Sequence, residues 1–331
     1  IEGLSTVGGL AVGVPGTIAG VFEVYEKYGT LKIEEIFQPV IDLALKGVVV
    51  TKKQEARLKQ YYSEINHNKT FWNGSENVQY DKSSLWKRVW NEKDTIKYTA
   101  LAKTLKRIML NGKKEFYEGK TASELVKFIQ KNGGIITLKD LKSYEPKWRK
   151  PVIFEYDDLK IISMAPPSSG GICLEQIMKM INPYDLQKYG HNQVDYIKLL
   201  VEAERRAYAD RSFYLGDPDF NEIPYKKITS DEYLSARMKD FSFSTPTLSK
   251  DLNPGKINIT ESSETTHYSI LDQFGNSVSV TTTLNAAYGS KLYSDELGFF
   301  LNNEMDDFSS KPGVPNMYGL IGSEINQIEP G

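Results

Sequence analysis

The sequence predicts a mixed α+β fold in which helices come first and strands follow. Most segments before residue 215 carry apolar residues at helical spacing, whereas residues 265–284 are rich in Thr, Val, Ile and Tyr. Two short alternating segments within 151–164 add strand character to the helical part. With 331 residues, the chain is long enough for one large domain or two ordinary ones.

The sequence predicts a series of helices, and residues typical of helix ends mark several of their boundaries. Residues 17–47 carry helical spacing, and Pro39 is expected to divide this stretch into two helices. Thr121 is expected to cap a helix that Gly133 and Gly134 end. The remaining helices are expected at 52–66, 98–111, 121–132, from 137 onward, 171–181 and 193–214.

Two antiparallel strand pairs are expected. The first lies within 151–164 and turns at 156–158. The second is a hairpin of residues 265–271 and 277–284, which flank a short polar loop that contains glycine.

The loop of this hairpin predicts its register. A three-residue loop would place Gly275 at the left-handed position that such loops need. Pairing then runs from 271 with 277 to Thr265 with Thr283, and directly opposed residues have Cβ atoms about 4.5–5.5 Å apart. The Thr283 hydroxyl is therefore expected to contact the Thr265 hydroxyl and to hold its rotamer.

The composition argues against several classes of function. The 41 Lys and Arg and 43 Asp and Glu residues leave a net charge of −2, and no basic stripe stands out, which argues against a nucleic-acid partner. Cys173 is the single cysteine, so no internal disulfide can form, and its apolar surroundings indicate a buried thiol. No apolar run approaches the roughly 18 residues of a membrane span.

The Glu264–Thr265 bond is a candidate site for producing a nucleophile by cleavage. A threonine hydroxyl needs a base within hydrogen-bonding reach. Cleavage would give Thr265 a free α-amino group with a pKa of roughly 7.7–8.0, which is suited to act as that base near neutral pH. From the residues alone, an ordinary threonine-rich strand pair remains an alternative.

Seven long motifs occur in a specific order. Four follow residue 263, namely ETTHYS at 264–269, TTTLN at 281–285, LNNEMDDFS at 301–309 and KPGVPNMYGLIG at 311–322. Three precede it, namely VGVPGTIAG at 12–20, PPSSGG at 166–171 and EAERRAYADRSFYLGDPDF at 202–220. Together they resemble the γ-glutamyltranspeptidases, and the resemblance covers nearly the whole chain, with only a loose match at 48–98.

The resemblance implies a fold and a maturation step. The fold would be the four-layer αββα sandwich of the N-terminal-nucleophile hydrolases, incomplete at both ends in this chain. A zymogen would cleave its own Glu264–Thr265 bond, and the two subunits would stay together as a heterodimer. Residues 1–264 would form the C-terminal part of the large subunit, mostly helical with strands near 151–164. Residues 265–331 would begin the small subunit, with the nucleophile hairpin and a lid loop.

The resemblance also implies residue roles. Thr265 is the expected nucleophile, and Thr283 matches the threonine that positions it. Tyr318 would be the aromatic latch of a lid at 311–322 that covers the donor. An ammonium group is bound by carboxylate and amide oxygens, and some family members carry Gln at the Glu304 position. The residues expected to bind the donor's α-amino group are Asn285, Glu304 and Asp307.

The implied reaction is γ-glutamyl transfer from glutathione and related amides to water or amino acids, through a threonine acyl-enzyme and without a cofactor. A poly-γ-glutamate transpeptidase or a β-lactam acylase on the same fold is the first alternative, and an unprocessed inactive fragment is the second. By resemblance, the compartment would be periplasmic or extracellular, although the chain starts at Ile1 without a signal peptide.

Three further family elements are expected beyond the two ends of the chain. An arginine for the donor's α-carboxylate would precede Ile1, and a Ser-Ser pair and the Gly-Gly turn of the oxyanion hole would follow Gly331. Loss of one oxyanion donor lowers a rate by roughly 10²–10³. This chain alone is therefore expected to be a poor catalyst or none.

Structural interpretations of the other motifs stay open. Residues 303–307 fit a solvated acidic turn, and 311–322 fit a surface loop. Residues 166–171 lack the ending of a phosphate loop, which favours a structural turn before a helix. His67, His191 and His267 show no metal-site spacing, although His267 shares a strand face with Thr265 and could tune the site.

Overall fold

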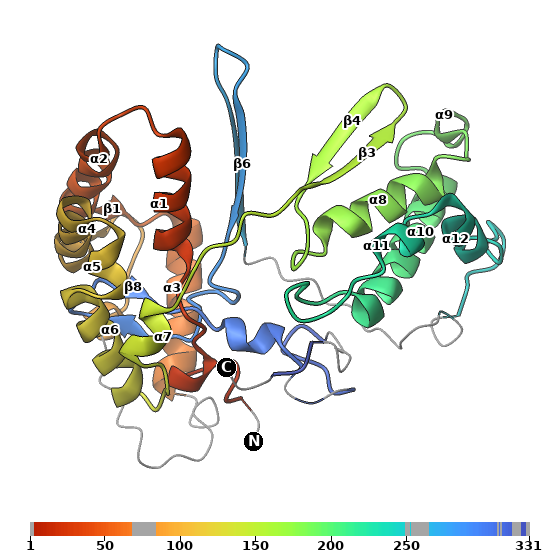
Figure 1. Ribbon diagram of the computed structural model, residues 1–331. Coiled ribbons are helices and arrows are strands. Elements are labelled where there is room, and N and C mark those ends of the chain that lie inside the picture. Colours follow the sequence, from red (N-terminus) through yellow and green to blue (C-terminus); the bar gives the residue numbers. More distant parts are fainter. Residues whose placement is uncertain are drawn as a thin grey trace. The chain divides into compact units, whose positions relative to one another are not determined.

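The computed structural model describes residues 3–67, 84–248, 252, 265–309, 311, 313–319 and 326–328 of the 331-residue chain. These residues form helices and short antiparallel sheets (Figure 1), so the predicted mixture of helix and strand is confirmed. The chain divides into two compact units. The first comprises Ile1–Lys147 and Ser262–Asp307, and the second comprises Trp148–Glu261 and Phe308–Gly331.

The first unit contains the helices that were predicted before residue 147. Its helices are α1 (Thr17–Tyr28), α2 (Ile33–Lys46), α3 (Lys52–His67), α4 (Thr99–Asn111), α5 (Lys113–Tyr117), α6 (Lys120–Lys131) and α7 (Leu138–Lys142). Short 3-10 turns are η1 (Gly9–Ala11), η3 (Ser84–Trp86) and η5 (Glu304–Asp307). Its strands pair as β1 (Val48–Val49) with β2 (Thr95–Ile96), β5 (Thr266–Leu271) with β6 (Ser277–Thr282), and β7 (Tyr293–Ser294) with β8 (Phe299–Phe300).

Two of the predicted helix signals are wrong in detail. Pro39 lies inside α2, and the break between α1 and α2 falls instead at Gly29, which ends α1. Thr121 is the second residue of α6 rather than its cap. The carboxylate of Glu115, from the preceding helix, accepts the Thr121 backbone N–H at 3.1 Å and does the work of a capping side chain.

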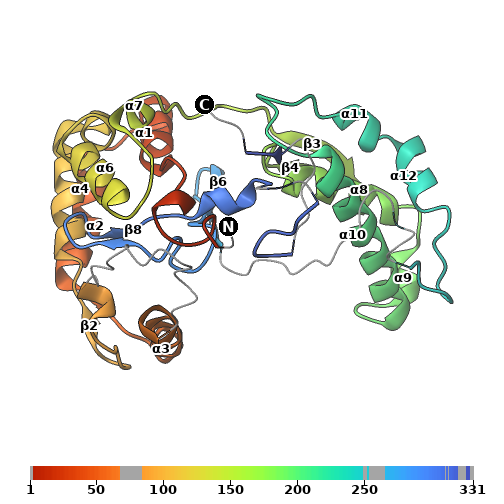
Figure 2. The same ribbon diagram turned by 90° about the horizontal axis from the view of Figure 1, so that it is seen from below.

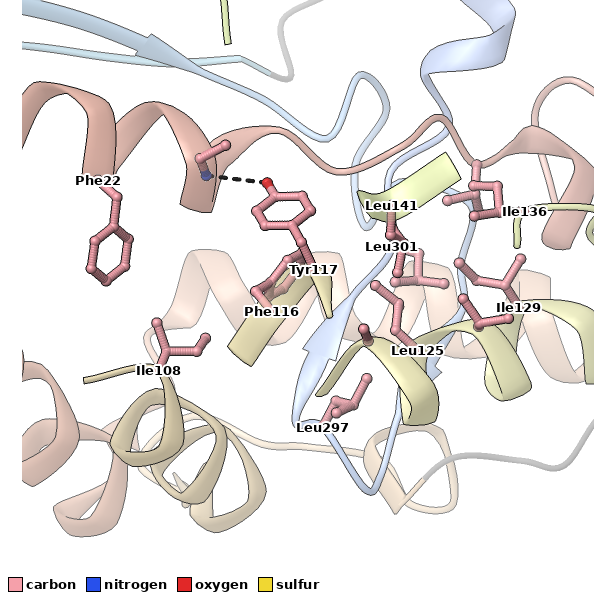
Figure 3. Packing of buried hydrophobic residues seen from close by; sticks show 14 of the residues in the cluster. Phe22, Ile108, Phe116, Tyr117, Leu125, Ile129, Ile136, Leu141, Leu297 and Leu301 are labelled. Atoms are coloured by element: carbon pink, nitrogen blue, oxygen red, sulfur yellow. Dashed lines mark hydrogen bonds between the residues drawn. The ribbon is translucent and has the colours of Figure 1, made fainter. Parts of the chain in front are cut away.

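Residues from both ends of the first unit share one apolar core. Helix α2 packs along α4, and the two lie side by side in Figures 1 and 2. Figure 3 shows Leu297 and Leu301 among residues of α6 and α7, such as Leu125 and Leu141, and these four side chains are at most 1% exposed. Fully burying a leucine stabilises a fold by about 1.5–3 kcal/mol, so this packing anchors the segment that precedes η5.

The β5–β6 hairpin has the predicted register. Leu271 pairs with Ser277, and the ladder continues to Thr266 with Thr282. Gly275 has a φ of 84°, the left-handed conformation predicted for the third loop residue. Nearly every residue of both strands is exposed, and the apolar side chains Tyr268, Ile270 and Val278 are among them.

The second unit is a helical layer with one strand pair. The predicted strands form β3 (Val152–Tyr156) and β4 (Leu159–Ser163) around a turn at Asp157. Its helices are α8 (Gly170–Ile181), α9 (Leu186–Tyr189), α10 (Val194–Tyr214), α11 (Tyr225–Ile228) and α12 (Asp231–Arg237). Helix α8 packs on α10 around buried apolar residues such as Ile172 and Leu199.

The motif at 166–171 is a turn that leads into α8, as predicted. Arg211 donates from Nε to Ser169 Oγ at 2.8 Å, so this serine is held by a neighbouring helix. Cys173 is buried as expected, and desolvation raises the pKa of its thiol to about 11. Among the described residues, no helix is both long and apolar enough to cross a bilayer.

Candidate active site

The predicted nucleophile and its expected positioning residue lie together. Thr265 directly precedes β5, and its Oγ1 donates to Thr283 Oγ1 at 3.4 Å. Both threonines are exposed, so the Thr265 hydroxyl is accessible to a substrate. Glu264, the expected partner in the cleaved bond, lies outside the described residues.

Thr283 also connects the hairpin to the next predicted site residue. Its Oγ1 accepts the backbone N–H of Asn285 at 2.9 Å. Asn285 is buried and has a φ of 70°, a left-handed conformation that asparagine tolerates better than most residues. Its Nδ2 donates to the carbonyl of Asn303 at 3.0 Å, which fixes the orientation of the Asn285 amide.

The loop after Asn285 has an unusual backbone that packing holds in place. Its left-handed residues are Asn285, Tyr288, Gly289 and Lys291. The Tyr288 ring lies against Trp86 and Phe300, with centroids 5.2 and 5.0 Å away. A Cβ on Gly289 would lie 2.0 Å from the carbonyl oxygen of Leu301, so this position has no room for a side chain.

Two predicted carboxylates lie together on η5. Glu304 is half-buried and hydrogen-bonds to the exposed Asp307. Burial, and then the Asp307 charge, raise the pKa of Glu304 to about 7. Two carboxyl groups that resist simultaneous ionisation form a site with affinity for a cation.

Asn302 and Asn303 were missed by the sequence reasoning, although both lie within the motif at 301–309. Asn303 is fully buried, and its Oδ1 accepts the backbone N–H of Ala286 at 2.9 Å. Asn302 Oδ1 accepts the N–H groups of Gly13 at 2.9 Å and Glu304 at 3.1 Å. The sequence does carry a signal for them, since two consecutive amides follow the apolar Leu301 and precede the acidic residues from 304. Amides that are buried need hydrogen-bond partners, so such a pair indicates a structural role.

His267 joins a row of hydroxyl groups on the face of the hairpin that carries Thr265. Its Nδ1 lies 2.8 Å from Thr281 Oγ1, and its Nε2 lies 3.3 Å from Ser269 Oγ. Ser269 Oγ lies in turn 3.0 Å from Ser279 Oγ. These bonds support the two strands next to the Thr265–Thr283 pair.

Tyr318 belongs to the second unit, and the other five predicted site residues of the described chain belong to the first. Tyr318 is half-buried, and its backbone N–H donates to Asn316 Oδ1 at 3.0 Å. Gly313 and Gly319 have φ values of 77° and 74°, which gives the described part of the predicted lid two tight turns.

The described residues contain no group of three or more His, Cys, Asp and Glu side chains that could hold a metal ion. The site instead combines an exposed threonine hydroxyl, a second hydroxyl that holds it, a fixed amide and a pair of carboxyl groups. Such a set can present a nucleophile and can bind a molecule that carries an ammonium group.

Comparisons with known proteins identify the family. The profile of the family described as Gamma-glutamyltranspeptidase matches residues 2–331. The glutathione hydrolase proenzyme of Escherichia coli (strain K12) is 41% identical over 323 residues, which are 97% of this chain and 54% of that protein. The chain therefore belongs to the γ-glutamyltranspeptidase family, as its motifs predict, and it spans about half the length of the curated relatives it matches.

Solved structures agree with this assignment. Helicobacter pylori γ-glutamyltranspeptidase is 39% identical with a TM-score of 0.69, over 80% of this chain and 73% of that one. Cephalosporin acylase from Bacillus halodurans has a TM-score of 0.77 over 96% of this chain and 57% of that one. Because its identity is only 23%, this second likeness concerns the fold alone.

Proposed function

We propose that the complete protein transfers γ-glutamyl groups from glutathione and related amides to water or to amino acids, with Thr265 as the nucleophile. The observation that carries this proposal is the hydrogen-bonded series from the Thr265 hydroxyl through Thr283 to Asn285, in the register that the three-residue hairpin loop predicts. Membership of the γ-glutamyltranspeptidase family supports it.

Maturation would use the same hydroxyl as turnover. Thr265 Oγ1 adds to the Glu264 carbonyl carbon and the peptide C–N bond breaks. The hydroxyl proton passes to the nitrogen, so an ester forms and the nitrogen becomes the free α-amine of Thr265. Water then cleaves the ester, which returns the hydroxyl and leaves a carboxylate on Glu264. Thr265 thereby gains the base that its hydroxyl lacks.

Turnover follows from these two groups. The hydroxyl oxygen of Thr265 bonds to the γ-carbonyl carbon of the donor, and its proton passes to the α-amine of the same residue. That amine gives the proton to the leaving nitrogen as the γ-amide bond breaks, which produces a γ-glutamyl ester. Water or an acceptor amine then attacks the ester and releases Thr265.

We assign binding of the donor's α-amino group to Asn285, Glu304 and Asp307, and hydrogen bonds through Thr283 and Asn303 connect their segments to Thr265. The hydrogen bond between Glu304 and Asp307, together with the bond that orients Asn285, supports this assignment. Tyr318 would act as the latch of a lid loop at 311–322, for which the turns at Gly313 and Gly319 give a suitable backbone.

For the complete protein we propose the four-layer αββα sandwich and a heterodimer of two subunits. In this arrangement residues 1–264 end the large subunit and residues 265–331 begin the small one. The exposed apolar side chains of the β5–β6 hairpin support the sandwich, because a lone two-stranded sheet is marginally stable and needs further strands or a helix against it. We place the mature enzyme in the periplasm or outside the cell.

The main alternative is an acylase or a poly-γ-glutamate transpeptidase on the same fold. The pair of carboxyl groups at Glu304 and Asp307 favours a donor that carries a cationic amino group, which a glutaryl donor lacks. A γ-glutamyl anilide should therefore be hydrolysed much faster than a glutaryl anilide. Equal rates would favour an acylase.

The direct test is Thr265→Ala in the full-length protein. We expect one uncut polypeptide without γ-glutamyl transfer. The unsubstituted protein should instead give two fragments, with a new N-terminus at Thr265 by mass spectrometry. Thr265→Ser serves as the matched variant, because it keeps a hydroxyl and should still be cut. Normal processing of Thr265→Ala would remove Thr265 from this role.

A further inference from the structure

Two consecutive buried amides, Asn302 and Asn303, precede η5 and hold different parts of the site. Asn302 is 8% exposed and Asn303 is fully buried. Asn303 bonds to the segment at 284–286, which includes Asn285. Asn302 instead bonds to the segment before α1. The proposed reaction gives Asn302 no role.

Asn302 makes a reciprocal pair of hydrogen bonds with the backbone of Gly13. Its Oδ1 accepts the Gly13 N–H at 2.9 Å, and its Nδ2 donates to the Gly13 carbonyl at 3.0 Å. The same Oδ1 accepts the Glu304 N–H at 3.1 Å. One side chain thus connects the backbone of Glu304 to that of Gly13.

Gly13 leaves little room for a side chain at this contact. A Cβ on Gly13 would lie 3.3 Å from the Glu304 Cβ and 3.7 Å from Asn302 Oδ1. The first distance is shorter than an ordinary carbon contact, so a methyl group on Gly13 would require the Glu304 side chain to shift by a few tenths of an ångström. The Asn302–Gly13 pair, defined here as the amide clamp, therefore holds the Glu304 backbone and lies against the base of its side chain.

The amide clamp joins residues from opposite sides of the Glu264–Thr265 bond. Gly13 precedes that bond and Asn302 follows it. Two further bonds also cross from the N-terminal segment to residues after Thr265: Ser5 Oγ donates to Asp306 Oδ1 at 2.6 Å, and the Gly8 N–H donates to the Ser290 carbonyl at 3.1 Å. After cleavage, all of these bonds would run between two polypeptides.

We propose that Asn302 is a positioning residue for donor selectivity, and that the amide clamp sets the Glu304 carboxylate where it meets the donor's α-amino group. This inference rests on the proposed function, because it takes γ-glutamyl donors as the substrates. It adds that recognition of the amino group depends on residues of both subunits. Asn302 acts through Glu304 and does not touch the donor.

The test uses two chromogenic donors that differ in one group, γ-glutamyl-p-nitroanilide and glutaryl-p-nitroanilide. The readout is the ratio of kcat/KM for the two donors, measured with the processed full-length enzyme. We expect Asn302→Ala to lower this ratio by about tenfold, mainly by raising KM for the γ-glutamyl donor, because a displaced carboxylate loses the contact that only this donor offers. Gly13→Ala, which keeps every hydrogen-bonding group, should lower the ratio in the same direction.

A double mutant separates positioning from general destabilisation. In a Glu304→Ala background, Asn302→Ala should lower the ratio no further, because both changes remove the same interaction. Gln176→Leu is the matched control, since it removes a buried amide of the second unit that donates to Asp210 and to the Ile228 carbonyl. It should lower the melting temperature and leave the ratio unchanged.

The inference is overturned if Asn302→Ala and Gly13→Ala both keep the ratio of the unsubstituted enzyme, or if Asn302→Ala lowers it equally with and without Glu304. If Asn302→Ala does not fold, Gly13→Ala alone decides. A failure of the proposed function looks different, because Thr265→Ala would then still be cut, or the unsubstituted enzyme would show no preference for the γ-glutamyl donor.

Discussion

At the scale of residues, the Thr283 hydroxyl has two tasks. It accepts the Asn285 N–H at 2.9 Å and contacts the Thr265 hydroxyl at 3.4 Å. A hydroxyl has two lone pairs and one proton, so it can accept from both neighbours at once. The hydroxyl of the proposed nucleophile and the backbone of Asn285, the residue proposed to bind the donor, thereby contact the same oxygen atom.

We expect Thr283→Val to slow both self-cleavage and turnover by about ten- to a hundredfold, because it leaves the Thr265 rotamer unheld and the Asn285 N–H without its acceptor. Thr283→Ser keeps the oxygen and should stay within a few-fold of the unsubstituted protein. The measurements are the rate at which the precursor band disappears on a gel and kcat with a γ-glutamyl anilide. Equal rates for the Val and Ser variants would contradict this role.

The Glu304–Asp307 pair predicts a pH dependence of donor binding. Burial and the Asp307 charge raise the pKa of Glu304 from 4.5 to about 7, so Glu304 is neutral below that pH and anionic above it. If the anion binds the ammonium group, KM for a γ-glutamyl donor should rise as the pH falls below 7, by up to about tenfold per pH unit.

Glu304→Gln is the matched variant for this prediction, because it removes the titration and keeps the shape. KM of this variant should vary little between pH 5.5 and 8, with the Thr265 amine, whose ordinary pKa is roughly 7.7–8.0, still governing kcat. Initial rates across this range separate the two effects. A KM profile that keeps its slope in the Gln variant would assign the titration to another group.

At the scale of elements, the sequence predicts those features that depend on neighbouring residues, such as the register of the β5–β6 hairpin. The three-residue loop with Gly275 sets the hairpin register, and this register brings Thr265 to Thr283. The loop from 285 to 291 was not predictable, because its left-handed residues include Tyr288, whose conformation follows from packing on distant rings. The Pro39 prediction was wrong for a related reason, since tertiary packing of α2 outweighs a local helix-breaking signal.

Gly275 in the hairpin loop and Gly289 in the 285–291 loop are expected to lose different amounts of stability when each is replaced by alanine. Both have positive φ, but a Cβ on Gly275 meets nothing within 4 Å, whereas one on Gly289 would lie 2.0 Å from the Leu301 carbonyl oxygen. Gly275→Ala should therefore lower the free energy of unfolding by about 1–2 kcal/mol, because only the left-handed backbone conformation becomes unfavourable. Gly289→Ala adds a clash with buried backbone and should lower the free energy of unfolding by roughly 2–5 kcal/mol.

Denaturant titration of both variants in the uncut Thr265→Ala protein measures these differences without interference from processing. Gly289→Ala should also disturb self-cleavage when Thr265 is present, since its loop carries Asn285. If the two variants had equal midpoints, the packing described for the 285–291 loop would be wrong.

At the scale of the whole molecule, the first unit is built from segments on both sides of the proposed cleavage site. Its core contains Leu297 and Leu301 together with helices that precede residue 147. Cleavage would therefore leave two polypeptides that share one apolar core, and the stability of that core would become the affinity between them. The amide clamp lies at the same junction.

Leu301→Ala tests this sharing. Loss of a leucine that is 1% exposed should weaken the core by about 2–5 kcal/mol in either form of the protein. In uncut Thr265→Ala protein the change is intramolecular, so its unfolding midpoint should fall by the same amount at every protein concentration. In the processed protein the subunits can separate, so the midpoint should fall further as the protein is diluted.

Leu284→Ala is the control, because that side chain is 36% exposed and should matter little in either form. A midpoint that is independent of concentration in the processed Leu301→Ala protein would show that the two polypeptides are held together elsewhere.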